Sequence, residues 1–316
     1  FVPKTGDRAD DLWPLFRVHA DPADNLFSAY FRSDIGDRVG GSIMLPLIGV
    51  TTEALPGIEL QWLTGFLVHL LLSSIRLAAF LLSAPAFGAR WLPLQARIMM
   101  TFMLIAIVVL RVPPIDVASL EALEVIMIIM AEAAVGLTAG LTLTVWFSAA
   151  LLAGEKIATS AGLGFAAQLD PQTGAQSPVV SQLLYLFLTV VFFSINGHLI
   201  VLGMMLMSYE ILPVGAMPPI PVLLQSVIEA AGAMFFAATL VMMPVVVVLI
   251  MVNAAIGLIT RSAPQLNLFS FGFPISLLAV FFMLFVSVGA LGEASVNLVN
   301  AAVESLEIMM EGLANG

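Results

Sequence analysis

The sequence of 316 residues is 60% hydrophobic and 10% charged, with a mean hydropathy of +1.07. Soluble domains carry about 25% charged residues, so this composition predicts an integral membrane protein. The formal net charge of −10 argues against a nucleic-acid partner, because few bases are present to neutralise phosphates. Without cysteine, the sequence has no disulfide, thiol nucleophile or cysteine-based metal site.

Residues 1–57 differ from the rest of the sequence because acidic and basic side chains are spread through them. They contain no basic stretch followed by an apolar one, so they do not resemble a signal peptide. The sequence begins at Phe1, and Met44 is a plausible native start. We expect this segment to be either a small polar appendage or a stretch upstream of the true start.

Apolar stretches begin shortly after this segment. Residues 60–84 have the length of a membrane-spanning helix, which needs about 20 apolar residues. Residues 98–110 would form a helix of only about 20 Å, which is short for a hydrocarbon core of about 30 Å. We therefore expect this segment not to cross in the ordinary way. Residues 125–152 form the next predicted span, and a glycine-rich loop is expected from Gly154 to Pro178.

Three uncharged stretches follow, over residues 179–209, 230–260 and 262–292, each longer than one untilted crossing requires. Each contains residues that interrupt helices: Asn196-Gly197, then Pro244, then Gly272 and Pro274. Such segments suggest broken helices packed against protein. We predict an all-α integral membrane protein with about six long, partly broken hydrophobic helices or hairpins. Its membrane domain covers residues 58–292, and residues 293–316 form an amphipathic C-terminal helix.

Two charged side chains lie within the apolar stretches. Inserting the charged side chain of Glu132 into a membrane costs about 2.5–3.5 kcal/mol on insertion scales, so Glu132 is a candidate functional residue. Arg76 in the first span is its natural partner. Three roles remain open for Glu132: a structural ion pair, a proton relay, or a contact between subunits.

Other polar residues give weaker signals. Asn196, Gly197 and His198 fit either a loop between two short helices or polar contacts between packed helices. An isolated histidine supplies no metal site. HExxH, Walker and paired-carboxylate motifs are absent from the sequence, so we expect no enzyme, no cofactor and no metal.

Taken in order, several motifs resemble one family. They are Gln61-Trp62, Arg76 and Ala84-Pro85; Glu132 to Gly136; Gly154 to Ile157; Gly162, Gly164 and Phe165; Asp170-Pro171; Asn196 to His198; Ser208 and Pro213; Asn253 and Gly257; and Arg261, Pro264, Gln265, Asn267, Phe269, Gly272 and Pro274. From about Met44 to the end, this order resembles the family of the flagellar biosynthetic protein FliR and its injectisome relatives.

The resemblance implies a single-copy subunit of a type III export gate in the bacterial inner membrane, at the flagellar basal body. It implies FliP-type and FliQ-type gate subunits, FlhB-type and FlhA-type export proteins, and membrane lipid as partners. The assembly exports unfolded flagellar proteins. An injectisome gate is the alternative within the family. An ion-coupled secondary transporter using Arg76, Glu132 and the Asn196 break is the alternative outside it. We see no repeat between the two halves that would favour a transporter.

The resemblance also implies a loop that helps plug the pore, formed by Gly162, Gly164, Phe165, Gln168, Asp170 and Pro171. Small residues let such a loop pack closely, and Phe165 would exclude water and ions from the closed gate. Gln168 stands where many relatives carry a second aromatic residue, which leaves the tightness of the plug in question. An ordinary connecting loop is the other interpretation.

Overall fold

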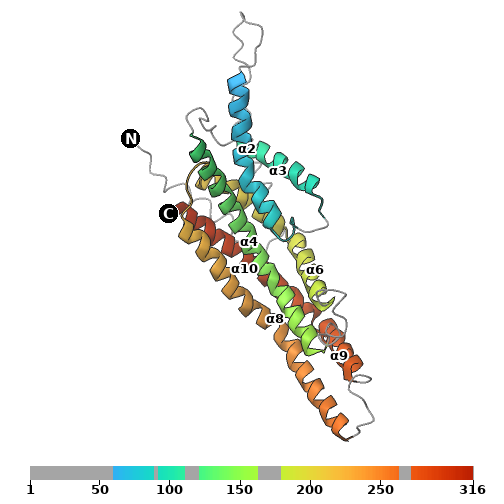
Figure 1. Cartoon of the computed structure of the whole chain (residues 1–316). Helices are drawn as coiled ribbons and strands as arrows, with labels where there is room; N and C mark the ends of the chain where they lie inside the picture. Colours follow the sequence, from blue (N-terminus) through green and yellow to red (C-terminus); the bar gives the residue numbers. More distant parts are fainter. Residues whose placement is uncertain (1–59, 89–91, 111–120, 163–178, 263–271, 316) are drawn as a thin grey trace, which may run out of the picture. The chain divides into compact units, whose positions relative to one another are not determined.

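A computed structural model describes residues 60–88, 92–110, 121–162, 179–262 and 272–315 (Figure 1). The elements assigned over these residues are all α-helices. They are α2 (Leu60–Ser83), α3 (Leu94–Val109), α4 (Ala122–Ser160), α6 (Val179–Ser194), α7 (Gly197–Ile211), α8 (Ile220–Ser262), α9 (Phe273–Val286) and α10 (Val288–Asn315). The all-α membrane fold predicted from the sequence is therefore confirmed. The polar segment 1–57 and Met44 lie outside the described residues.

The helix lengths explain which elements suit a membrane. Over the described residues, three helices are long and apolar enough to cross: α2, α4 and α8. The number rises to five if the broken pairs α6–α7 and α9–α10 each count as one span. At 1.5 Å per residue, the 43 residues of α8 extend about 64 Å, far beyond a hydrocarbon core of about 30 Å. With 16 residues, α3 is short, as the sequence predicts.

Two predicted interruptions are wrong, because the helices run through them. Pro244 lies inside α8, although it offers no N–H to the carbonyl four residues earlier. Membrane helices tolerate such a proline where neighbouring helices, hydroxyl side chains or a local adjustment of the helix satisfy the carbonyl that it frees. The predicted loop was expected to begin at Gly154, but α4 continues through this residue to Ser160. A Cβ at Gly154 would meet the backbone of Ser181 on α6, so this glycine allows two helices to approach closely.

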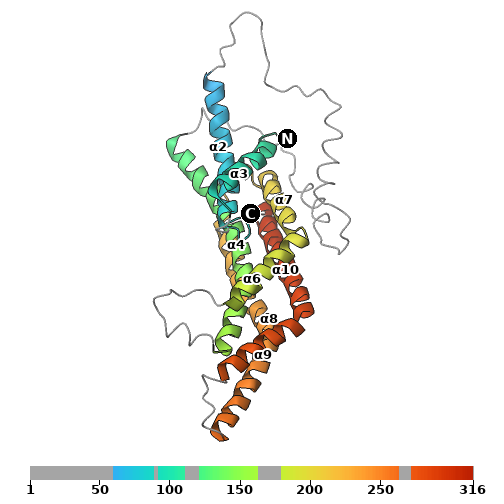
Figure 2. The same cartoon turned by 90° about the vertical axis from the view of Figure 1, so that its right-hand side faces the viewer.

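Other interruptions are present. Helices α6 and α7 are separated at Ile195 and Asn196, and Asn196 has a φ of 59°. Asparagine tolerates this left-handed conformation better than most residues. Gly272 and Pro274 mark the start of α9. A further break at Ser287, which the sequence analysis did not predict, bends α9 from α10 by 68° (Figure 2). The C-terminal helix accordingly begins at Val288 rather than at residue 293.

The described chain forms two compact units. The first combines residues up to Leu141 with His198–Ser226 and the residues from Leu306 onward. Within it, α2 packs against α3 and runs beside the first half of α4 (Figure 1). The second unit combines Thr142–Gly197 with Val227–Ser305. Its core includes an edge-to-face contact between the rings of Phe147 on α4 and Phe192 on α6, with centroids 5.3 Å apart.

Candidate functional site

The first unit contains a buried ion pair between α2 and α4. Arg76 is 0% exposed and Glu132 is 1% exposed. The Nε of Arg76 donates to Oε2 of Glu132 at 2.8 Å, and its Nη2 donates to Oε1 at 3.0 Å. Both carboxylate oxygens thus accept from one guanidinium in the bidentate geometry that strengthens such pairs. The pairing expected from the sequence is present.

The remaining donors of Arg76 bind the C-terminal end of α7. Nη1 donates to the carbonyl oxygen of Ser208 at 2.8 Å and to its hydroxyl at 3.0 Å. Nη2 also donates to the carbonyl oxygen of Leu212 at 2.9 Å. The carbonyl of Leu212 lies just beyond α7, where carbonyls lack donors from the helix, whereas the Ser208 carbonyl also accepts from the N–H of Leu212 at 2.9 Å. A guanidinium has five N–H donors, and all five of Arg76 have acceptors here.

An aromatic ring and a backbone contact complete this cluster. The Cζ of Arg76 lies 4.3 Å from the ring centroid of Tyr209, within cation–π range. The hydroxyl of Tyr209 donates to the carbonyl oxygen of Ser73 on α2 at 2.6 Å. The backbone of Gly215 lies close to the Glu132 carboxylate, and Gly215 has a φ of 93° that favours glycine. We call Arg76, Glu132, Ser208, Tyr209 and Gly215 the arginine cluster.

Close helix packing brings the two charges together. A Cβ at Gly136 would collide with the backbone carbonyl of Arg76, and a Cβ at Gly140 would collide with the hydroxyl of Ser83. Each of these glycines lies on the face of α4 that meets α2. The sequence places Gly136 four residues after Glu132, so the carboxylate and the close contact lie on one face of the helix.

The cluster is suited to holding helices and poorly suited to moving protons. Each charge is neutralised by its partner, and the donors of the arginine are fully used, so neither group has a free position for a transported ion. Among the three roles left open by the sequence, this geometry favours the structural ion pair. Sequence reasoning assigned no role to Ser208, Tyr209 or Gly215. Of these three residues, only Tyr209 could have been suspected from the sequence, because a tyrosine hydroxyl in an apolar segment needs a hydrogen-bond partner.

A second polar group lies in the other unit. Nδ2 of Asn253 on α8 donates to the carbonyl oxygen of Ser160 at the end of α4, at 2.9 Å. Its Oδ1 accepts from the hydroxyl of Ser276 on α9 at 3.0 Å. The sequence analysis included Asn253 in the family pattern and gave it no function.

The other predicted site residues are scattered or lie outside the described residues. Gly162 follows the end of α4 with a φ of 83°, and Arg261 lies in the last turn of α8. Gly197 begins α7, where a Cβ would press on the ring of Phe192, and His198 follows it. The predicted residues outside the described part are Gly164, Phe165, Gln168, Asp170, Pro171, Pro264, Gln265, Asn267 and Phe269.

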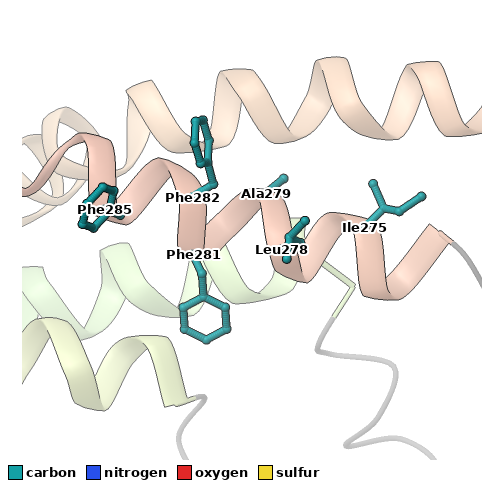
Figure 3. A pocket seen from close by; sticks show the side chains of 6 residues that line it. All are labelled: Ile275, Leu278, Ala279, Phe281, Phe282 and Phe285. Carbon is teal, nitrogen blue, oxygen red and sulfur yellow. The ribbon is translucent and has the colours of Figure 1, made fainter.

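One open hollow of about 550 Å³ lies along α9 (Figure 3). Its lining comes from this helix alone: Ile275, Leu278, Ala279, Phe281, Phe282 and Phe285. Phe281 and Phe282 point to different sides of the helix (Figure 3). Small-molecule sites combine an enclosed apolar wall with a few convergent polar groups, and this lining has no polar side chain. Within the described residues, no group of three His, Cys, Asp or Glu side chains is placed to hold a metal.

Fold and site together define a helical membrane protein whose buried charges bind its own helices. The comparison with known protein families identifies which membrane proteins the chain is related to. The chain belongs to the family described as bacterial export proteins, family 1, whose family model matches residues 67–302.

Named relatives agree with this membership. The chain is 32% identical to the flagellar biosynthetic protein FliR of Bacillus subtilis strain 168, over 76% of this chain and 93% of that protein. It is 30% identical to FliR of Pectobacterium carotovorum, over 64% of this chain and 77% of that protein. It is 26% identical to the surface presentation of antigens protein SpaR of Shigella sonnei, over 54% and 66% of the two chains. The resemblance inferred from the sequence is confirmed, and the chain is a membrane component of a bacterial export apparatus, in a family of export proteins rather than of enzymes.

Proposed function

We propose that the chain is a non-enzymatic core subunit of a flagellar-type type III export gate. In this proposal it helps form the channel that passes unfolded flagellar proteins across the bacterial inner membrane at the basal body. The observation that carries the proposal is the family match over residues 67–302, which covers most of the helices. FliP-type and FliQ-type subunits and FlhB-type and FlhA-type proteins are the proposed partners.

The exposure of α8 supports a role as a subunit. Only 17% of the most apolar part of this helix is buried within the chain. A protein that transports on its own needs its transport pathway enclosed, whereas a gate subunit can leave such a helix for its neighbours. We propose residues 58–292 as the gate domain, with residues 162–171 as the segment that helps plug the channel. Phe165 would block the closed channel by excluding water.

The alternatives have less support. A secondary transporter would need Arg76 and Glu132 to exchange partners during transport, yet both are buried and bonded to each other. The SpaR relative favours an injectisome gate as the second candidate, although the flagellar relatives match more of the chain.

Co-purification tests the proposal. The tagged chain would be expressed with the FliP-type and FliQ-type proteins of its own genome and purified in mild detergent. Native mass spectrometry should find one copy of this chain in a larger stable complex. A stable, partner-free monomer or homodimer would instead contradict the gate and favour transport assays on Glu132→Gln.

A further inference from the structure

The buried ion pair contacts the backbone that joins α7 to α8. This α7–α8 turn covers residues 212–219 and lies wholly within the first unit. Nη2 of Arg76 donates to the carbonyl oxygen of Leu212 at 2.9 Å. The carboxylate of Glu132 lies close to the backbone of Gly215. Both members of the pair therefore reach the turn, at two points along its backbone.

The sequence of the α7–α8 turn restricts its conformation. The N–H of Ala216 donates to the carbonyl oxygen of Pro213 at 3.0 Å, which closes a β-turn. Gly215 is the third residue of this β-turn, and its φ of 93° is typical of type II, which favours glycine there. Prolines at 213, 218 and 219 lack an N–H, so the α7–α8 turn has more carbonyls than donors of its own. In apolar surroundings it depends on donors from other helices.

Gly215 lies over a buried part of α4. A Cβ at this position would lie 3.7 Å from Cδ1 of Ile128, which is an ordinary contact distance. Ile128 is buried and precedes Glu132 by four residues, so both lie on one face of α4. The α7–α8 turn thus packs on the face of α4 that carries the carboxylate.

Helix α8 begins directly from this turn. The N–H groups of Val222 and Leu223 donate to the carbonyl oxygen of Pro219 at 3.0 Å and 3.4 Å. A Cβ at Gly312 would collide with the side chain of Val222, because the end of α10 lies against the start of α8 (Figure 1). The position of the α7–α8 turn therefore determines where α8 begins.

We propose that Arg76 and Glu132 are positioning residues for the α7–α8 turn, which clamp its backbone onto α4 and thereby fix the start of α8. Holding α2 to α4 requires only the ion pair and close helix packing. The bond to Leu212 and the approach to Gly215 serve the turn instead. The clamp goes beyond the proposed function, because it is a property of the fold of this chain and requires no partner.

Distances between spin labels test the clamp. The chain has no cysteine, so labelled cysteines can be introduced in pairs without competing thiols. Exposed Leu123 on α4 is the common reference, combined separately with Met217 in the turn, Leu224 near the start of α8, or Leu71 on α2, which are all exposed. The pair of Leu123 with Leu71 is the control, because it reports on α2 and α4 alone. Electron paramagnetic resonance of the full chain in mild detergent gives each distance distribution.

Two variants remove the clamp in different ways. Arg76→Lys keeps a positive charge opposite Glu132, but one ammonium cannot reproduce the planar fork that also reaches Leu212. The double variant Arg76→Met with Glu132→Leu removes both contacts with the turn and leaves no unpaired charge. The contact between α2 and α4 should survive in both variants, because Gly136 and Gly140 also lie in it.

We expect the turn and α8 distances to change from a single narrow distribution to a broad one in both variants. The distance between α2 and α4 should keep its narrow distribution. Unchanged turn and α8 distances in a folded variant would overturn the proposal, as would equal broadening of all three distances. If neither variant folded, the pair would be needed for the fold as a whole rather than for the turn, which also contradicts the clamp.

Gly215→Ala disturbs the turn while both charged residues stay in place. The added methyl group fits beside Ile128, but its Cβ disfavours the left-handed conformation of this residue. We expect broader turn and α8 distances here too, with the control distance unchanged. Gly203→Ala is the matched substitution on α7, where the Cβ enters open space, and it should change none of the distances. A narrow α8 distance in Gly215→Ala would mean that the turn does not fix the start of α8.

Discussion

Arg76 shows how a full charge can lie inside an apolar helical protein. Its guanidinium is planar and offers five donors, and the arginine cluster places a carboxylate, two helix-end carbonyls and a hydroxyl around it. Lysine offers a single ammonium with three donors and cannot reproduce this planar arrangement. Removing either charge leaves the other buried without compensation, which is the expensive change.

We expect Arg76→Met and Glu132→Leu each to destabilise the chain by about 3–5 kcal/mol, because each leaves an unpaired buried charge. The double variant should recover part of that loss, since two apolar side chains replace the pair. Recovery should be incomplete because the carbonyl oxygen of Leu212 loses its arginine donor. Unfolding of the chain in mild detergent, followed by loss of helical circular dichroism, measures the cycle.

Ser74→Ala is the control for this cycle, because Ser74 lies on α2 and bonds only Leu71 in its own turn. It should change stability by less than about 0.5 kcal/mol. If the double variant were as unstable as the sum of the single ones, the two residues would not be acting as a pair.

Glu132→Gln separates packing from proton transfer. The amide keeps the shape of the side chain and one acceptor oxygen but leaves the Arg76 charge uncompensated, so we expect a loss of about 3 kcal/mol in stability, the low end of the range for Glu132→Leu, and continued export by the protein that assembles. A proton relay would instead be abolished, because glutamine does not titrate. Secretion of a flagellar substrate, normalised to the amount of this chain in the membrane, is the measurement. Normal protein levels with no secretion would contradict a structural role.

At the residue scale, the pairing of buried charged side chains could be predicted from the sequence, whereas their contacts with backbone carbonyls could not. Glu132 and Arg76 stand in apolar stretches, where a charge needs a partner, so their pairing could be predicted. The acceptors at Ser208 and Leu212 are mainly backbone carbonyls, which every residue carries. The contacts of Asn253 were likewise hidden, because its partners are a helix-end carbonyl and a serine distant in the sequence.

At the element scale, glycines decide how closely helices approach. Gly136 and Gly140 lie where α2 crosses α4, and Gly154 lies where α6 passes α4. Small residues at such contacts let helix backbones pack closely in membranes. A glycine elsewhere on a helix has no such role: a Cβ at Gly203 on α7 would meet nothing within 4 Å.

Gly136→Ala and Gly203→Ala should therefore act in opposite directions. The first forces α4 away from the backbone of Arg76, and we expect it to destabilise the chain by about 1–3 kcal/mol. The second adds a better helix former in open space, so it should be neutral or stabilise by up to about 1 kcal/mol. Thermal unfolding of both variants in the same detergent tests the difference. Equal effects would mean that α2 and α4 do not meet at Gly136.

The same reasoning explains which helix boundaries were predictable. The breaks at Asn196 and at Gly272–Pro274 coincide with residues that disfavour a continuous helix, so they were visible in the sequence. Pro244 carries an equally strong signal, yet α8 continues through it. Gly154 looked like a loop residue and instead serves a helix contact. The bend at Ser287 has neither glycine nor proline at the break itself, so it could not be predicted from the sequence.

At the scale of the whole molecule, the chain leaves much of its apolar surface uncovered. On α8, Phe236 is 68% exposed, whereas Leu249 on the same helix is 0% exposed. A large apolar surface marks contact with lipid or with another protein. Lipid and partner subunits make different predictions, because only a partner can be captured as a defined cross-linked protein.

A photo-cross-linking amino acid at Phe236 should capture a FliP-type or FliQ-type subunit when the proteins are expressed together. The same group at Leu249 should yield no intermolecular product, because that side chain is buried within the chain. Immunoblotting for each partner reads out the result. A product at Phe236 places α8 at a contact between subunits and explains why its most apolar part is only 17% buried. If Phe236 reacts with lipid alone while the complex is intact, α8 faces the bilayer and the subunit contact lies on another helix.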